Sequence, residues 1–272
     1  MTMRDTLTQH WPEYLMEAAG LGIFMISACV FAVVLEHPAS PIRKAIYYPL
    51  LRRMVMGMAM GLTAAGIIYS PWGKQSGAHL NPSVTLAFFR LGKVDPWDSF
   101  FYTLSQFAGG LAGVLVATAG LGSWIADPSV NYAVTVPGLA GPVVAFVAEL
   151  VISFGLMFAV LATSNTDCLA RFTGLIAGAL IATFISVEAP LSGMSMNPAR
   201  TLGSALPAQF LTALWIYFTA PPLGMLLAAE VYQRRKGAEH IFCAKLHHRN
   251  TKRCIFCGDP GLTDNAKRLL RG

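Results

Sequence analysis

The sequence has few charged residues. Only 12% of its 272 residues are Asp, Glu, Lys or Arg, whereas soluble domains carry about 25%. Hydrophobic residues make up 54% of the chain. The composition therefore indicates an integral membrane protein and argues against a soluble domain.

The long apolar segments also lack the groups that an enzyme needs. No nucleophile beside a base and no metal-binding cluster is found within them. Ionisable residues are rare there, and Glu17 and Glu149 fall at matching early positions in the two halves of the chain. Such residues inside a membrane need partners. We therefore predict that the protein is not an enzyme. An ion-coupled transporter, with the two glutamates as a proton relay, stays an alternative.

Six apolar runs are long enough to cross a bilayer, and two shorter runs are not. Helices are the structure that satisfies the backbone within such spans. The predicted full helices cover 13–35, 54–70, 98–121, 142–163, 171–187 and 211–233, and the predicted half-helices cover 81–90 and 197–206. Each half holds three full helices, an odd number, so the second half must be inverted in the membrane.

The predicted domain organisation follows from these runs. Residues 1–12 form a polar N-terminus, and residues 13–233 form the membrane domain. Its first repeat is 13–121 and its second is 142–233. Residues 234–272 form a basic tail that contains Cys and His.

Two short motifs occupy matching places in the two halves. They read Ser-Gly-Ala-His-Leu-Asn-Pro-Ser at 76–83 and Ser-Gly-Met-Ser-Met-Asn-Pro-Ala-Arg at 192–200. Asn is a favoured N-cap, and Pro fits the first turn of a helix. Each motif therefore predicts a loop that leads into a half-helix beginning at Asn. Two interrupted segments in matching places indicate a site near the membrane midplane.

Two half-helices that enter from opposite faces would bring their N-termini together. Each N-terminus carries about half a positive charge, so the combined field repels cations. Asn81 and Asn197 can each donate an N–H to one passing oxygen. A water molecule bound in this way points its hydrogens outward, which interrupts a chain of proton transfer. The alternative is a purely structural role, in which each Asn is only an N-cap.

These motifs resemble the paired Asn-Pro-Ala boxes of the aquaporin and glycerol-facilitator family, the major intrinsic proteins. The resemblance covers roughly residues 11–233. The second box is intact, and the first has Ser in place of Ala: Asn81, Pro82, Ser83, then Asn197, Pro198, Ala199. The resemblance implies an all-α membrane fold, which is a right-handed bundle of six transmembrane helices and two half-helices in an inverted repeat. It also implies a homotetramer.

The resemblance also implies roles for single residues. Glu17 and Glu149 would hold the two motif loops by accepting backbone N–H bonds, and His79 would support the first loop. Arg200 would line an outer constriction, donate to solutes and repel cations.

This outer constriction is the selectivity filter of the family, and its other three positions also carry over from the resemblance. They fall at Ile185, at Met194, and at either Met60 or Gly61. Family spacing selects Gly61, whereas the local match of Met-Gly-Leu selects Met60. Water-selective members have an aromatic residue and a His in this ring, and this chain has neither, so the filter should be apolar and wider. We expect passive conduction of water, with passage of small neutral solutes, and exclusion of protons and ions. A glycerol or small-solute facilitator is the alternative.

The Lys and Arg residues predict the orientation. Ten of the 20 follow residue 233, and the loop 122–140 contains none. By the positive-inside rule both termini are cytoplasmic, in the plasma or inner membrane. A basic group at Arg43, Lys44, Arg52 and Arg53 disagrees with this orientation. The basic tail is expected to attract anionic lipid, and no nucleic-acid partner is predicted.

The tail contains a further pattern, Cys-x3-His-x6-Cys-x2-Cys. Its residues are Cys243, His247, Cys254 and Cys257, and His248 is a spare ligand. Three thiolates and an imidazole suit tetrahedral zinc. The sequence therefore predicts a zinc site in the tail, with incidental cysteines in a basic tail as the alternative. Conduction itself requires no cofactor.

Overall fold

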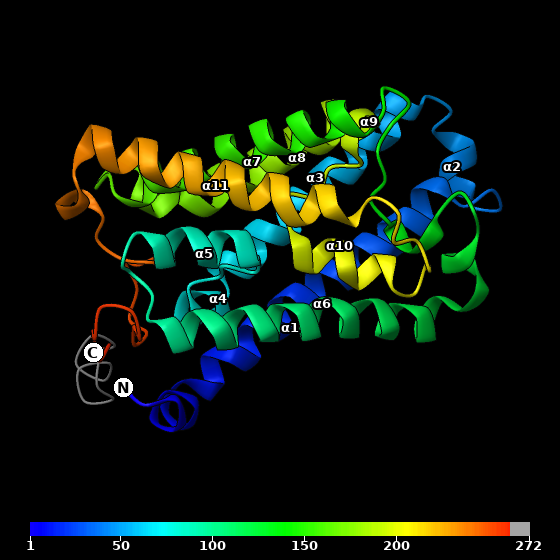
Figure 1. Ribbon diagram of the computed structural model, residues 1–272. Coiled ribbons are helices and arrows are strands. Elements are labelled where there is room, and N and C mark those ends of the chain that lie inside the picture. The colour runs from blue at the N-terminus through cyan, green and yellow to red at the C-terminus, as the bar shows by residue number, and fades with distance from the viewer. Residues whose placement is uncertain (262–272) are drawn as a thin grey trace, which may run out of the picture.

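The computed structural model describes residues 1–261 as an all-helical bundle (Figure 1). Within this range six helices are long and apolar enough to cross a membrane. They are α1 (Met3–Glu36), α3 (Pro49–Tyr69), α6 (Pro96–Leu121), α7 (Pro142–Ser164), α8 (Thr173–Val187) and α11 (Leu214–Lys236). The spans of α6 and α8 include adjoining 3-10 turns and cover Pro96–Ala126 and Ala170–Val187. Two half-helices, α5 (Pro82–Arg90) and α10 (Pro198–Ala205), lie between them. The predicted six spans and two half-helices are confirmed.

The connections contain short helical pieces. These are α2 (Pro41–Ala45), α4 (Pro71–Ser76), α9 (Ala189–Ser192) and the 3-10 turns η1 (Gly122–Ala126), η2 (Asn131–Ala133), η3 (Ala170–Phe172) and η4 (Ala238–His240). The N-terminus and the described part of the tail lie at the same end of the bundle, which we call the terminal face (Figure 1). The opposite face carries α2, α9, η1 and η2.

Three helices extend beyond their predicted bounds by three residues or more. α1 begins at Met3 because Thr2 and Asp5 form a capping box, in which the Thr2 side chain accepts from the Asp5 N–H and the Asp5 carboxylate accepts from the Thr2 N–H. α3 begins at Pro49, before the predicted start at 54. α11 continues to Lys236, since basic residues in a last turn suit the helix dipole. Hydrophobicity alone misses these polar turns.

The two halves have matching architecture. In the first half α1 packs on α6, in the second α7 packs on α11, and α3 packs on α8 across the halves. The motif loops also share one backbone path. Gly77 and Gly193 both have positive φ, 102° and 79°, in the left-handed region that favours glycine. Two non-glycine residues in each loop follow the same pattern: Ala78 and Leu80, Met194 and Met196.

The contact between α3 and α8 is close because small residues face one another. A Cβ added to Gly61 would lie 2.3 Å from the Gly178 carbonyl oxygen, so a larger residue would force the helices apart. Small residues at helix interfaces allow this approach in membranes.

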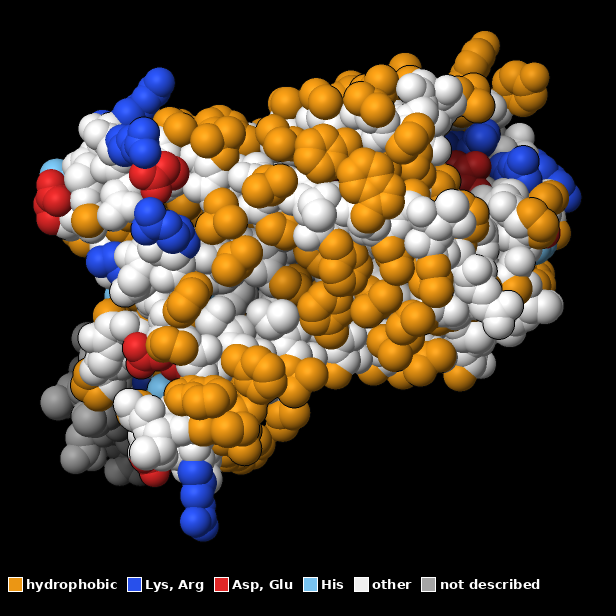
Figure 2. Space-filling model, in the orientation of Figure 1, with side chains coloured by type: hydrophobic (Ala, Val, Ile, Leu, Met, Phe, Trp, Pro, Cys, Tyr) orange, Lys and Arg blue, Asp and Glu red, His pale blue; other side chains and the backbone are white. Residues whose placement is uncertain are grey.

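The surface matches a membrane-spanning bundle. On the face that Figure 2 shows, a broad apolar band crosses the middle, and Lys and Arg gather toward the two ends. Exposed large side chains such as Leu104, Leu115, Trp215, Leu223 and Leu227 contribute to the apolar surface. The chain is therefore a multi-pass membrane protein.

Candidate functional site

The half-helices begin at the two motif asparagines. The Asn81 Oδ1 accepts a hydrogen bond from the Ser83 N–H at 2.8 Å. The Asn197 Oδ1 accepts from the N–H groups of Ala199 and Arg200 at 3.0 and 3.2 Å. Pro82 and Pro198 occupy the first helical positions, where a missing N–H costs nothing. The caps therefore use the oxygen of each side-chain amide and leave its NH2 free to point elsewhere.

Those NH2 groups connect the two repeats. The Asn81 Nδ2 donates to the Met196 carbonyl at 2.7 Å, and the Asn197 Nδ2 donates to the Leu80 carbonyl at 2.7 Å. Both asparagines line the same internal cavity. Because an amide NH2 has two hydrogens, each Asn keeps a second donor for a molecule in the cavity.

The cavity has a volume of about 280 Å³ and runs between the two half-helices. Most of its wall is apolar, with contributions from Leu21, Val84, Val160 and Ile181. The motif loops supply a second kind of wall. Residues 78–80 and 193–196 line the cavity with irregular backbone. Backbone of this kind is tolerated at membrane depth where it lines a water-filled space.

Four residues proposed for a filter lie on this cavity. Met60, Ile185, Met194 and Arg200 all line it. Gly61 faces α8 at Gly178 instead, so of the two alternatives on α3 it is Met60 that lines the wall. The Arg200 Nη1 is buried and has no hydrogen-bond partner among residues 1–261. Arg200 thus places a buried cationic donor in the wall of the same cavity as these apolar side chains.

Two buried carboxylates hold the motif loops from behind. Glu17 accepts hydrogen bonds from the N–H groups of His79 and Leu80 at 3.0 and 2.6 Å. Glu149 accepts from the N–H groups of Ser195 and Met196, both at 2.7 Å. Both glutamates are fully buried, and the lining of the cavity within the described chain includes neither. Their geometry is that of loop supports.

The remaining box residues pack around the half-helices. Ser83 is buried, and its hydroxyl has no partner among the described residues. Ala199 packs against α6, where a Cβ on Gly110 would lie 2.9 Å from the Ala199 carbonyl oxygen. The His79 ring bonds Thr85 at 3.0 Å through Nδ1 and the Ala244 carbonyl at 2.8 Å through Nε2. His79 therefore joins the first loop to the tail.

Sequence reasoning missed several lining residues. Arg53, Met56 and Ala64 line the cavity along α3 together with Met60. Successive members of this set are three, four and four residues apart, which places them on one helix face. The helical period therefore predicts the other three residues as cavity-lining if Met60 lines the cavity. Leu246 of the tail also lines the cavity. No pattern in the sequence marks that contact.

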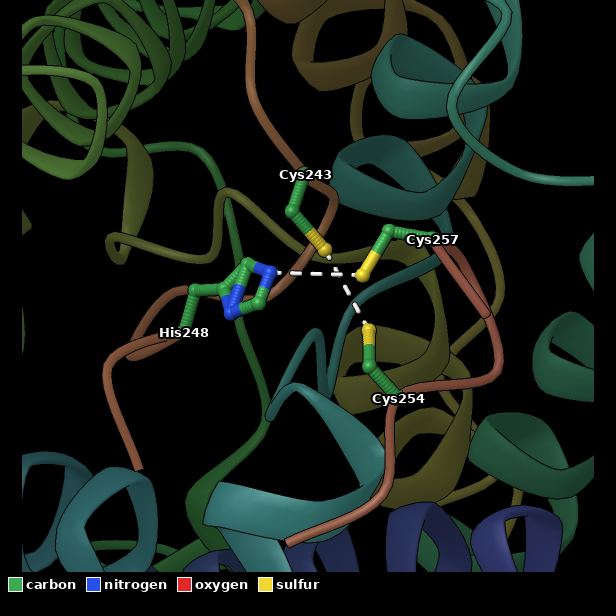
Figure 3. A group of neighbouring side chains, drawn as sticks. All are labelled: Cys243, His248, Cys254 and Cys257. Carbon is green, nitrogen blue, oxygen red and sulfur yellow. Dashed lines mark hydrogen bonds between the residues drawn. The ribbon is translucent and has the colours of Figure 1, made fainter. Parts of the chain in front are cut away.

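The tail brings together a Cys/His cluster (Figure 3). The side chains of Cys243, His248, Cys254 and Cys257 point toward one another, and their ligand atoms lie within 4.8 Å of each other. The hydrogen bond from Cys243 lowers the pKa of the Cys254 thiol below its usual range, which favours the thiolate.

One ligand of this cluster differs from the prediction. His248 takes the place expected for His247, whose ring packs edge-on against Tyr69 with centroids 5.2 Å apart. The chain turns at Leu246 and His247, so the two neighbouring histidines point in different directions.

Comparison with known proteins agrees with this geometry. The family described as Major intrinsic protein matches residues 5–232. The chain is 38% identical over 208 residues to Aquaporin NIP3-1 of Zea mays, covering 76% of this chain and 67% of that protein. It is 39% identical over 174 residues to Aquaporin NIP6-1 of Arabidopsis thaliana, covering 63% of this chain and only 54% of that one.

A solved structure shares the fold. The aquaglyceroporin from Plasmodium falciparum matches with a TM-score of 0.69 at 19% identity, covering 83% of this chain and 96% of that chain. At this identity the likeness concerns the fold alone. The family match, in contrast, covers both motifs and all six spans except the first residues of α1 and the last residues of α11. The chain therefore belongs to the major intrinsic protein family of membrane channels, and as such a channel it is not an enzyme.

Proposed function

We propose that the protein conducts water passively, together with small neutral solutes, and excludes protons and ions. The observation that carries this proposal is the pair of asparagine amides, Asn81 and Asn197, which cap half-helices of opposite repeats and line the same cavity. A molecule at this point meets hydrogen-bond donors from both sides and a positive field. Both features favour an uncharged oxygen-bearing solute.

The filter favours a broad choice of solute. Met60, Ile185 and Met194 offer no strong hydrogen bond, so in the proposed filter three apolar side chains accompany the charged group of Arg200. Such a ring lowers the steric barrier but leaves the desolvation cost of a polyol. We therefore expect water to pass fastest and glycerol or urea to pass more slowly. A glycerol facilitator would show the reverse order.

An ion-coupled transporter has less support. Glu17 and Glu149, the carboxylates that would form a proton relay, are occupied by backbone N–H groups of the motif loops. A relay needs a carboxylate that exchanges protons with the transport path. Their hydrogen bonds instead support a fixed loop geometry.

The test is stopped-flow shrinkage of proteoliposomes made with the full chain, in buffer that contains a metal chelator on both sides of the bilayer. We expect faster water efflux than from empty liposomes, slower but measurable glycerol and urea fluxes, and no proton leak with a pH dye. Water efflux equal to that of empty liposomes would refute conduction. Glycerol flux equal to the empty control would refute the wide filter alone.

We infer the assembly and its orientation from the family and the charge pattern. The expected assembly is a homotetramer in the plasma or inner membrane, with both termini cytoplasmic. The basic residues at the end of α11, Arg234, Arg235 and Lys236, support that orientation because they lie on the terminal face. Protease protection of the tail in sealed vesicles tests it.

We also propose that the tail cluster binds zinc. Three thiols and an imidazole nitrogen already converge from two short segments of the tail, and this donor set suits a structural zinc site with four protein ligands. The metal content of the purified protein tests the site. The Cys254→Ser variant should lose the zinc, whereas Cys168→Ser, which changes an exposed cysteine outside the cluster, should keep it.

A further inference from the structure

The tail does not leave the membrane domain after α11 but folds back across the terminal face (Figure 1). The Leu246 N–H donates to the Gly77 carbonyl at 3.1 Å, beside the first motif loop. The Leu246 side chain is buried and lines the cavity that holds Asn81 and Asn197. One apolar side chain of the tail thus enters the conducting space.

This leucine belongs to the apolar core of the bundle. Leu246 and Ala244 share one buried cluster with Val84, Val160 and Ala177, which come from α5, α7 and α8. Those helices belong to both repeats. The tail therefore closes over the junction of the two halves, where the path between them would open.

A second contact fixes the tail to the motif loop. The His79 Nε2 lies 2.8 Å from the Ala244 carbonyl oxygen, and the Phe256 ring stacks on the His79 ring with centroids 5.4 Å apart. His79 itself lines the cavity. The tail thus holds, from two sides, a residue that borders the pore centre.

Polar contacts attach the tail to both sides of the opening. On the second repeat, the Phe242 N–H donates to the Asn165 Oδ1 at 2.8 Å, and Arg249 pairs with Asp167. On the first repeat, the Arg253 Nη2 pairs with the buried Glu13 carboxylate at 2.6 Å. The tail is therefore a strap across the opening, anchored at its start and near its end.

The Cys/His cluster lies where it would lock this strap. Cys243 precedes Leu246 by three residues and His248 follows it by two, while Cys254 and Cys257 flank Phe256. One ion bound by all four would fix both tail segments that contact the motif loop. Without it, the described strap is held by the burial of Leu246 and Ala244 in the core cluster, by separate hydrogen bonds, and by two ion pairs, of which the exposed Arg249–Asp167 pair is weak.

From this placement we propose that residues 241–257 form a metal-braced plug, in which zinc binding holds Leu246 in the mouth of the pore and closes it, and zinc release opens it. An apolar side chain in a narrow opening blocks conduction by excluding water. The inference rests on the proposed water conduction and on the proposed zinc site.

The experiment measures water efflux from proteoliposomes of the full chain, with either zinc or a chelator on both sides of the bilayer. For the natural chain we expect efflux at least about threefold faster after chelation, returning to the slow rate when zinc is restored. Cys168→Ser is the matched control, since it removes a thiol outside the cluster. It should respond to zinc as the natural chain does.

Two variants separate the brace from the plug. Leu246→Ala keeps all four ligands, so it should bind zinc normally yet conduct rapidly with or without it. The double variant Cys254→Ser with Cys257→Ser should bind no zinc and conduct rapidly in both conditions. The first of these variants keeps the test decisive if the second fails to fold.

Three results would overturn different parts of the argument. Equal efflux of the natural chain with zinc and with chelator, both above empty liposomes, would overturn the plug and leave water conduction standing. Zinc sensitivity that persists in Leu246→Ala would overturn the role of Leu246. No efflux above empty liposomes in any variant, Leu246→Ala included, would overturn the proposed function itself.

Discussion

Asn81 and Met196 are 115 residues apart in sequence, yet the Asn81 Nδ2 donates a hydrogen bond to the Met196 carbonyl at 2.7 Å. The reciprocal bond joins Asn197 to Leu80 at the same distance. The cap of each half-helix is therefore tied to the backbone of the other repeat. The pore centre is a joint product of both halves, and its donors cannot shift independently.

Replacement of Arg200 tests ion exclusion. Arg200→Ala removes the buried cation from the cavity wall and widens the ring, so we expect a severalfold larger proton or cation leak in proteoliposomes. Arg200→Lys is the control, because it keeps the charge and should keep the leak low. A leak in Arg200→Ala equal to that of the natural chain would contradict its placement in the filter.

Substitution of Met60 should change solute selectivity, whereas substitution of Gly61 should lower stability. Met60→Ala widens the cavity wall, so we expect glycerol flux to rise relative to water while the protein folds normally. Gly61→Ala pushes a methyl group against the Gly178 carbonyl, and overpacking of this kind costs about 1–3 kcal/mol. Its signature is a lower Tm in detergent. A stable Gly61→Ala with altered solute preference would reverse the two assignments.

Neutralising Glu149 should loosen the second motif loop. In the natural chain the Glu149 carboxylate accepts hydrogen bonds from two backbone N–H groups. In Glu149→Gln the side-chain NH2 must face at least one of these N–H groups, which then loses its acceptor. An unsatisfied buried donor costs about 1–3 kcal/mol, so we expect a lower Tm and slower water flux. Glu239→Gln makes the same charge change on an exposed side chain and serves as the control. Equal Tm values for the two variants would argue against the loop-supporting role.

Ser83 offers a stabilising substitution. Its hydroxyl is buried without a partner among the described residues, and such a group costs about 1–3 kcal/mol. Ser83→Ala restores the common box sequence and should raise the Tm while water flux stays unchanged. Ser76→Ala is the contrasting variant, because the Ser76 hydroxyl donates to Glu17 at 2.7 Å and its loss should lower the Tm. A drop in Tm for Ser83→Ala would show that the hydroxyl is satisfied.

Local sequence patterns were sufficient to predict the membrane-spanning helices and the two half-helices. Apolar runs of sufficient length predict the six spans, since a bilayer demands helices of that length. Asn followed by Pro predicts the start of each half-helix, because capping depends only on neighbouring residues. The bounds erred where polar first and last turns continued a helix, as at Thr2 and Lys236.

The tertiary structure decided which neighbour of a pair faces the site. Successive residues of a helix point about 100° apart, so Met60 lines the cavity while Gly61 meets α8. In the tail a turn brings His248 rather than His247 to the cysteines. The insertion of Leu246 depends on the path of the tail across both repeats. Contacts between residues far apart in sequence leave no local pattern, because their free energy comes from surfaces that exist only once the bundle has formed.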